Sequence, residues 1–402
     1  MSRPAAEGTS ALHHSADAAF HTSDADEVLE CEIDLISGLD DGDVGQDTGD
    51  ATDLLTDEAE AMLTRARHVL IDNHVDLIEG IKAIERSRRA YDRGEPGQLL
   101  LITGASGTGK STIQREWIRR EYQRIVRTTG RIPQICNYGL VLTDGIDGDE
   151  RPIVFVNASS SRSTNALATQ ILRALGAEVP RALHGHQILD RLRMQLVGQK
   201  TRLLFIDEFH HTVSSRDELV EELSELVKDL LVETRVQLVL SGMQKAARPV
   251  DANPQLDRRC RMRFPVEPFS WGSEIEHRQE FLDFLADLEE GMDLPEASNL
   301  SDPKRAGRIH ASTGGILGRV TRLILIALEH GLEDGVMHVA DRYLAYAHET
   351  LKRSGERSNP FQPQASKNEQ APRRRVQRPS RTRGSLSGKP SAPTYEKTAR
   401  TV

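Results

Sequence analysis

An eight-residue glycine-rich segment restricts the fold of this chain more than any other feature of its sequence. Residues Gly104 to Ser111 read Gly-Ala-Ser-Gly-Thr-Gly-Lys-Ser and lie between the apolar run Leu99 to Thr103 and a helical pattern that starts at Thr112. A strand, a glycine-rich turn and a helix in this order form a P-loop, whose backbone N–H groups converge on phosphate oxygens. We therefore expect an ATP site made by Gly104, Ala105, Ser106, Gly107, Thr108, Gly109, Lys110, Ser111 and Thr112.

The charged and hydroxyl side chains of this segment have distinct expected roles. Lys110 supplies a point charge for the β- and γ-phosphates, and Ser111 offers a hydroxyl to a magnesium ion. The start of the following helix adds the positive end of its dipole to the same place. The segment thus predicts that the chain binds ATP together with Mg²⁺.

Two carboxylates about a hundred residues later complete the expected site. Arg202 to Ile206 is an apolar strand candidate, and Asp207 and Glu208 follow it directly. We expect Asp207 to hold the magnesium ion and Glu208 to orient or deprotonate the attacking water. His210 and His211 come next, and without a second ligand cluster we expect them to have a structural or coupling role.

Short apolar runs alternate with helical patterns through the middle of the chain. The expected strands are Gln98 to Thr103, Ile153 to Asn157, Arg202 to Ile206, Val236 to Ser241 and Arg261 to Val266. The expected helices between them are Ser111 to Arg127, Asn165 to Leu175, His186 to Val197 and Asp217 to Glu233. This alternation predicts an α/β fold with a central parallel sheet flanked by helices.

Composition and pattern divide the chain into five parts. Residues 1–56 form an acidic leader, and residues 1–62 hold 17 Asp or Glu against one basic residue. An N-terminal helical segment (57–95), the α/β nucleotide-binding domain (96–270) and a small helical domain (271–353) follow. Within the last, helices are expected at Glu274 to Glu290, Pro303 to Ala311, Leu317 to His330 and Val336 to Leu351. Residues 354–402 form a basic tail, and we expect both leader and tail to be disordered.

Several classes of protein are disfavoured by what the sequence contains. The chain has no stretch near the roughly 18 consecutive apolar residues that a membrane span needs. Its first residues lack the layout of a signal peptide, so we expect a cytoplasmic protein that does not contact membranes. Cys31, Cys136 and Cys260 are too scattered for a metal cluster or a disulfide framework.

Three further polar positions suit a nucleotide site. Ser241 ends a strand, where P-loop ATPases of the additional-strand class carry a polar residue that contacts the γ-phosphate or the lytic water. Arg258 or Arg259 could reach the nucleotide of a neighbouring subunit as an arginine finger; a solvated basic face or a DNA contact is the alternative. Arg319 opens a helix and could reach back over the phosphates, or it could be a surface arginine.

The stretch from Arg127 to Arg151 looks like an insertion between the P-loop helix and the second strand. It contains the acidic, turn-rich run Asp144 to Glu150. Its spacing lacks the glutamate that a calcium loop needs at the twelfth position. We therefore do not expect a calcium site there.

Taken together, these motifs resemble those of the AAA+ ATPases of transposons, TniB and its relative TnsC, and more distantly MuB. The resemblance spans roughly residues 60 to 350. It rests on Gly104 to Ser111, Ile206 to His211, Ser241 to Met243, Asn253 to Leu256 with the arginines that follow, and Thr313 to Gly315 with Arg319. The acidic leader and the basic tail have no counterpart in compact members of the family.

The resemblance implies an AAA+ fold with a C-terminal helical lid and a specific activity. Such a protein hydrolyses ATP slowly and only as a homo-oligomer, a ring or a helical filament, on duplex DNA of any sequence. It recruits or activates a DDE-type transposase, with a target-selection protein as a further partner, and ATP turnover controls disassembly. The alternative is a scaffold or adaptor, like signalling ATPases or helicase loaders, that uses ATP as a switch with little hydrolysis.

The basic tail has two competing uses. Residues 366–402 carry ten Lys or Arg against two Glu. These charges could hold DNA without sequence preference, or they could contact the acidic leader of another subunit. We favour DNA.

Overall fold

The structure is a computed structural model, and it describes residues 57–68, 75–144, 148–179, 185–272, 274–352 and 358–362. All of them belong to one contact unit, Met1–Gln362, and a second unit, Pro363–Val402, lies outside the described residues. The predictions of a disordered acidic leader and a disordered basic tail also fall outside them.

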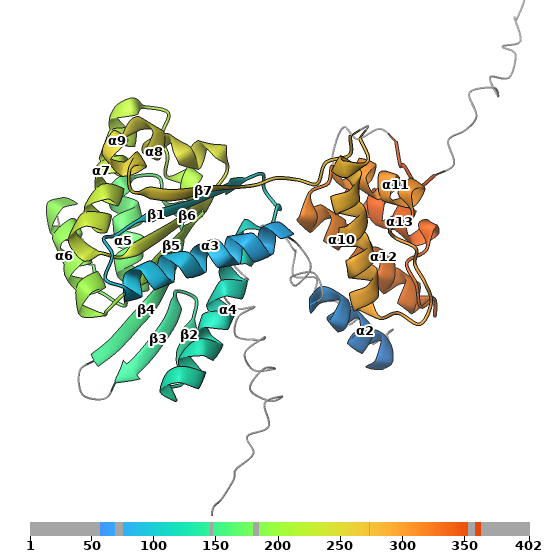
Figure 1. Ribbon diagram of the computed structural model, residues 1–402, viewed down its shortest axis with the longest axis horizontal. Coiled ribbons are helices and arrows are strands. Elements are labelled where there is room, and N and C mark those ends of the chain that lie inside the picture. Colours follow the sequence, from blue (N-terminus) through green and yellow to red (C-terminus); the bar gives the residue numbers. More distant parts are fainter. Residues whose placement is uncertain are drawn as a thin grey trace, which may run out of the picture. The chain divides into compact units, whose positions relative to one another are not determined.

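A seven-stranded sheet forms the centre of the α/β part of the chain (Figure 1). The strand order is β2-β3-β4-β5-β6-β1-β7. The strands are β1 (Leu99–Gly104), β2 (Gln134–Cys136), β3 (Gly139–Asp144), β4 (Gly148–Asn157), β5 (Leu203–Asp207), β6 (Gln237–Gly242) and β7 (Cys260–Val266). Strands β4, β5, β6, β1 and β7 are parallel. The predicted central parallel sheet is therefore confirmed, with each expected strand present within a few residues.

The stretch that the sequence marked as an insertion extends this sheet by an antiparallel hairpin. Strand β2 pairs with β3, and β3 pairs with β4, both antiparallel. The sequence did not predict these strands, because β2 has only three residues and lacks a clear apolar alternation. The acidic run proposed and rejected as a calcium loop contributes Asp149 and Glu150 to β4, while residues 145–147 lie outside the described part.

Helices cover both faces of the sheet because each parallel strand is apolar on both sides. Leu100 and Ile102 of β1 face the cluster that includes α3 (Val75–Asp92) and α4 (Lys110–Thr129). Leu99 and Leu101 face the opposite cluster, which holds α5 (Thr164–Ala174), α6 (Gly185–Gly198) and α7 (Asp217–Thr234). Short helices α8 (Arg248–Ala252) and α9 (Pro254–Asp257) and the 3₁₀ turns η1 (Ala158–Ser160), η2 (Phe209–His211) and η3 (Gln244–Ala247) complete this part. The result is a three-layer α/β arrangement.

The remaining helices form the C-terminal part, as the sequence predicted. They are α10 (Glu276–Met292), α11 (Pro303–Thr313), α12 (Leu317–Glu333) and α13 (Asp341–Leu351). Helix α2 (Asp57–His68) packs against α10 and α12, with Arg65 paired to Asp293 at 3.1 Å. The predicted segment 57–95 therefore holds two helices with different neighbours, since α3 packs against α4 and the sheet.

One predicted helix starts too early. The sequence pattern placed its first residue at Val336, whereas α13 begins at Asp341. The backbone N–H of Val336 donates to the carbonyl of Gly331, and that of Val339 donates to the Ser298 hydroxyl at 2.9 Å. These two apolar residues thus pack in a connecting segment, where periodicity alone cannot distinguish them from a helix.

None of the helices in the described residues is by itself long and apolar enough to cross a bilayer; only α11 and α12 taken together, as a pair bent by 113°, reach that length and composition.

Candidate nucleotide site

The P-loop connects the end of a central strand to the start of a helix. Strand β1 ends at Gly104 and α4 begins at Lys110. Gly109 caps the helix with a φ of 100°, a left-handed conformation that side chains other than glycine disfavour. At Gly104 an added Cβ would lie 2.3 Å from the carbonyl oxygen of Val266. These glycines let the loop bend tightly between β1 and β7 and direct its N–H groups and the helix dipole to one point.

The lysine of the loop is buried and bonded to the loop itself. Lys110 donates from Nζ to the carbonyl of Ala105 at 2.7 Å, and the Thr108 hydroxyl donates to the same carbonyl at 2.9 Å. Only 4 % of Lys110 is exposed. The ammonium group is therefore held inside the curve of the loop, where a phosphate chain would lie.

The Asp207 carboxylate accepts hydrogen bonds from three separate elements. Ser111 of α4 donates to Oδ2 at 2.5 Å, the Ser241 hydroxyl of β6 donates to Oδ1, and the backbone N–H of Glu208 donates to Oδ1 at 2.9 Å. Asp207 is buried at the carboxyl end of β5. The structure thus brings Ser111, Asp207 and Ser241 together as the sequence predicted.

Gln114 is a member of this network that the sequence reasoning missed. It lies one turn after Lys110 and donates from Nε2 to the Ser241 hydroxyl at 2.5 Å. Both Gln114 and Ser241 are fully buried. A polar residue on the apolar face of α4, between Ile113 and Trp117, was the available signal. The Ser241 hydroxyl accepts a hydrogen bond from Gln114 and donates one to Asp207. A contact from Ser241 to a phosphate or a water would therefore require these hydrogen bonds to rearrange.

The donor set at Asp207 fits a magnesium ion. Mg²⁺ prefers oxygen ligands and usually takes one or two from the protein, the rest from water and phosphate. The Ser111 hydroxyl and the Asp207 carboxylate are already in contact at 2.5 Å, next to the P-loop. These two residues would hold the ion between the loop and β5.

Glu208 stands in a constrained position beside two histidines. Its backbone is left-handed, with a φ of 53°. Its Oε2 lies 3.4 Å from Nδ1 of His210 and 3.4 Å from Nε2 of His211. A non-glycine residue in this conformation costs free energy that the surrounding fold must supply, and such residues cluster at functional sites.

The neighbours of the two histidines define their tautomers. Arg162 Nη1 lies 3.2 Å from His211 Nδ1, and an arginine can only donate, so Nδ1 accepts and Nε2–H points to Glu208. The backbone N–H of Met243 donates to His210 Nδ1 at 3.3 Å. Burial, followed by the neighbouring His211, Lys110 and Lys245, lowers the pKa of His210 from near 6.5 to about 4, so this ring is neutral at pH 7.

These bonds argue against a metal ion at the histidines. Candidate ligand atoms of Glu208, His210 and His211 do lie within 4.8 Å of one another. However, a metal at His210 Nδ1 would displace the Met243 N–H, and a metal at His211 Nε2 would put a proton on Nδ1 against Arg162. Of the two rings, His211 is the one that can donate from Nε2 to the Glu208 carboxylate. Arg162 is the second contributor that the sequence reasoning missed, since it lies 46 residues before Glu208 in the chain.

Arg258 and Arg259 lie at the opposite edge of the sheet from the P-loop. The carbonyl of Arg259 accepts from the N–H of Leu99, the first residue of β1, whereas the P-loop follows the last residue of β1. At about 3.3 Å per residue, the two ends of β1 are roughly 17 Å apart. The structure therefore does not bring these arginines to the nucleotide site of their own chain.

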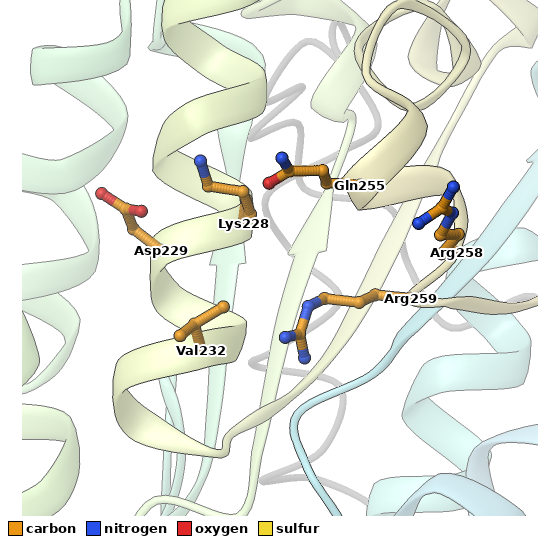
Figure 2. A pocket seen from close by; sticks show the side chains of 6 residues that line it. All are labelled: Lys228, Asp229, Val232, Gln255, Arg258 and Arg259. Atoms are coloured by element: carbon orange, nitrogen blue, oxygen red, sulfur yellow. The ribbon is translucent and has the colours of Figure 1, made fainter.

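The two arginines line an open pocket of about 480 Å³ with Lys228, Asp229, Val232 and Gln255. Figure 2 shows their guanidinium groups pointing to different sides. Arg259 is half-buried and donates to the carbonyl of Gly97 at 3.4 Å, while Arg258 is exposed. In the same stretch, Arg263 is bound by Asp251 at 2.6 Å and by Asp257 at 2.7 Å. The side chain of Arg258 is thus held less by bonds within the chain than those of Arg259 and Arg263.

Helix α12 contacts the P-loop at its first turn. The backbone N–H of Gly318 donates to the carbonyl of Gly107 at 2.8 Å. Arg319 follows directly, and its Nη1 lies 3.4 Å from the carbonyl of Thr313 at the end of α11. The structure places Arg319 next to the loop, with its guanidinium against the end of α11, and its reach over the phosphates stays a prediction.

The fold and the motifs define a nucleotide-binding protein with the AAA+ P-loop ATPase fold. Its central sheet of parallel strands is flanked by helices, and the P-loop, the Asp-Glu pair and Ser241 meet at one edge. Residues 92–249 match the AAA domain family. This part of the chain is therefore similar to AAA domains and has the AAA+ P-loop ATPase fold.

Comparison with solved structures gives matches of low sequence identity. Cdc6p from Pyrobaculum aerophilum is 15 % identical, with a TM-score of 0.51 and coverage of 74 % of this chain and 71 % of that chain. The ORC2 protein of Aeropyrum pernix is 15 % identical, with a TM-score of 0.49 and coverage of 72 % and 73 %. The ORC1 protein of the same organism, solved in complex with DNA, is 18 % identical, with a TM-score of 0.46 and coverage of 68 % and 64 %. No curated protein matches the chain.

Proposed function

We propose that this chain is an ATP-dependent regulator that assembles on duplex DNA and hydrolyses ATP at sites shared between neighbouring subunits. The observation that carries the proposal is the division of its polar residues between two edges of the sheet. The P-loop, Asp207 and Glu208 meet at the carboxyl edge, while Arg258 and Arg259 lie at the amino edge. A second copy whose amino edge meets the carboxyl edge of the first would complete the site.

The chain's own residues divide the chemistry among them. The loop N–H groups and Lys110 would bind and orient the phosphates. Ser111 and Asp207 would hold a magnesium ion, which when bound would supply positive charge to neutralise the phosphate oxygens. Glu208 accepts a proton from the attacking water or orients it. His211, fixed by Arg162, holds the Glu208 carboxylate in place. An arginine from the neighbour stabilises the charge that develops on the phosphate oxygens.

The particular role in DNA transposition rests on the resemblance of the motifs to TniB and TnsC. On that basis we propose that the assembly recruits or activates a DDE-type transposase and that ATP turnover controls its disassembly. The proposed assembly also explains why a lone subunit would be a slow ATPase, since it lacks the arginine. We propose a cytoplasmic location for it.

DNA binding in the presence of a nonhydrolysable ATP analogue tests the proposal. We expect oligomers on duplex DNA of any sequence, with an affinity that falls steeply with salt because lysines and arginines release counterions from the phosphates. The measurement is a salt titration of the dissociation constant, with size analysis of the complex. Binding that is absent, or that does not change between 50 and 200 mM salt, would contradict the proposal.

A further inference from the structure

The helix that follows the P-loop carries an unusual concentration of arginine. Between residues 115 and 131 the chain has six arginines and two acidic residues, Glu116 and Glu121. The apolar residues Ile113, Trp117, Ile118 and Ile125 of α4 are buried against the sheet. The arginines therefore lie on the sides of the helix that do not face the core.

Two buried carboxylates fix the positions of these arginines. Glu116, with 3 % of its side chain exposed, accepts from Arg119 at 2.7 and 2.8 Å and from Arg120 at 2.5 Å. Glu121, with 2 % exposed, accepts from Nε and Nη2 of Arg124. Burial alone would raise the pKa of Glu116, but the bonds from Arg119 and Arg120 lower it, so the carboxylate stays charged.

The pairing with Glu116 does not use all the charge of these arginines. One buried carboxylate binds both Arg119 and Arg120, and it can neutralise only one of these two cations. A carboxylate takes two of the five N–H donors of a guanidinium when it binds both Nε and Nη2, as at Arg124. About a third of the side chain is exposed in Arg119 and Arg124, and 44 % in Arg120. Arg127, also exposed, adds a fourth cation.

We infer that Arg119, Arg120, Arg124 and Arg127, the α4 arginine surface, bind the phosphate backbone of duplex DNA. Arg120, Arg124 and Arg127 are spaced i, i+4 and i+7 and share one side of the helix, over a rise of about 10 Å. Guanidinium groups bind phosphate oxygens with two parallel N–H donors. This inference rests on the DNA binding proposed above and assigns it to a surface on the α/β domain.

The composition of the surface favours DNA over an acidic protein. Protein interfaces have an apolar centre with aromatic or aliphatic anchors. Along α4, which is described over its whole length, no large apolar side chain is exposed. A row of fixed cations without an apolar anchor suits a partner whose affinity comes from counterion release.

The test compares full-length variants in a salt titration with a duplex DNA fragment and a nonhydrolysable ATP analogue. One variant carries Arg120→Gln, Arg124→Gln and Arg127→Gln. The control carries Lys304→Gln, Arg216→Gln and Arg322→Gln, three exposed cations elsewhere. We expect the first variant to lose about 100-fold in affinity and to reduce the slope of log K against log salt by about 2 to 3. The control should stay within about threefold, since long-range electrostatic effects are screened by salt.

A charge-preserving variant guards against a trivial loss of fold. Arg120→Lys, Arg124→Lys and Arg127→Lys keep the three charges, so most of the salt slope should remain. If wild type binds DNA and the glutamine variant matches the control, the inference is overturned while the proposed function stands. If wild type binds no DNA, the proposed function and this inference are both wrong. If poly-glutamate competes as well as DNA of equal charge, the partner is an acidic protein and the inference is wrong.

Discussion

The two edges of the central sheet differ in how completely their polar groups are bonded within the chain. At the carboxyl edge, Ser111, Asp207, Ser241 and Gln114 form one continuous hydrogen-bonded network with buried members. At the amino edge, Arg258 is exposed and Arg259 makes one long bond to a backbone carbonyl. The comparison indicates that the nucleotide-binding half of the site is preorganised in a single subunit. Under the proposed function, a neighbouring subunit completes the half that stabilises the transition state.

Removing the amino-edge arginines should have the largest effect. An arginine finger contributes roughly 10³- to 10⁵-fold to turnover, so we expect Arg258→Ala combined with Arg259→Ala to reduce steady-state ATP hydrolysis at least about 10³-fold in the DNA-bound assembly. Nucleotide affinity, measured by titration of a fluorescent ATP analogue, should change by less than about threefold.

Arg263→Ala is the matched control for that pair. It removes an arginine of the same stretch that is already bound by Asp251 and Asp257. Exposed ion pairs contribute roughly 0 to 1 kcal/mol, so stability and turnover should change little. If Arg263→Ala lost as much turnover as the double variant, Arg258 and Arg259 would not be the arginine finger.

Glu208→Gln tests the carboxyl edge directly. Loss of a general base typically costs about 10²- to 10⁴-fold, so turnover should fall by that range while ATP binding persists. The variant should therefore accumulate as a long-lived DNA complex, measured by its dissociation rate after a chase with competitor DNA. If the complex lifetime does not change, the result favours the alternative hypothesis, in which the chain is an adaptor that uses ATP as a switch without hydrolysis.

A smaller effect is expected at Gln114. Gln114→Leu keeps the size of the side chain but removes the donor to Ser241. We expect the Mg²⁺ concentration for half-maximal activity to rise about fivefold, because one buried hydrogen bond is worth about 1 kcal/mol. Gln123→Leu, on the same helix and half-buried, is the control and should leave the Mg²⁺ requirement unchanged. If the two variants raised the Mg²⁺ requirement equally, Gln114 would have no specific role in the Asp207 network.

Replacing His210 should have the smallest effect at neutral pH, and its effect on stability should appear in acid. Its folded pKa is about 4, below the ordinary value near 6.5, so the unfolded chain binds the extra proton between these values and acid favours unfolding. Wild type should lose about 1 to 2 kcal/mol more unfolding free energy than His210→Gln between pH 7 and pH 5. Urea denaturation at the two pH values measures the difference. Parallel losses in both proteins would show that His210 does not contribute.

The sequence predicted the parts of the site that depend on local pattern. The P-loop and the Asp207-Glu208 pair follow apolar strands buried on both faces, and such runs are recognisable in a single chain. Gln114, Arg162 and the bond from Ser241 to Asp207 depend on residues 34 to 127 positions apart, which only the tertiary structure brings together. The β2–β3 hairpin escaped prediction because β2 has only three residues and β3 begins with Gly139, which weakens the strand pattern.

The sequence also could not show that Arg258 and Arg259 lie at the far edge of the sheet. Their position follows from the pairing of β7 beside β1, in which Leu99 is the partner of Cys260, far along the chain. That placement, rather than the arginines themselves, makes a site shared between subunits the simplest account of the molecule.

Mixing two inactive variants tests this account most directly. One subunit carries Glu208→Gln with both arginines intact, and the other carries Arg258→Ala and Arg259→Ala with Glu208 intact. If the sites are shared, an equimolar mixture on DNA should recover roughly a quarter of wild-type ATP turnover, because that fraction of interfaces pairs an intact Glu208 with an intact arginine. Turnover no greater than the average of the two variants alone would contradict the account.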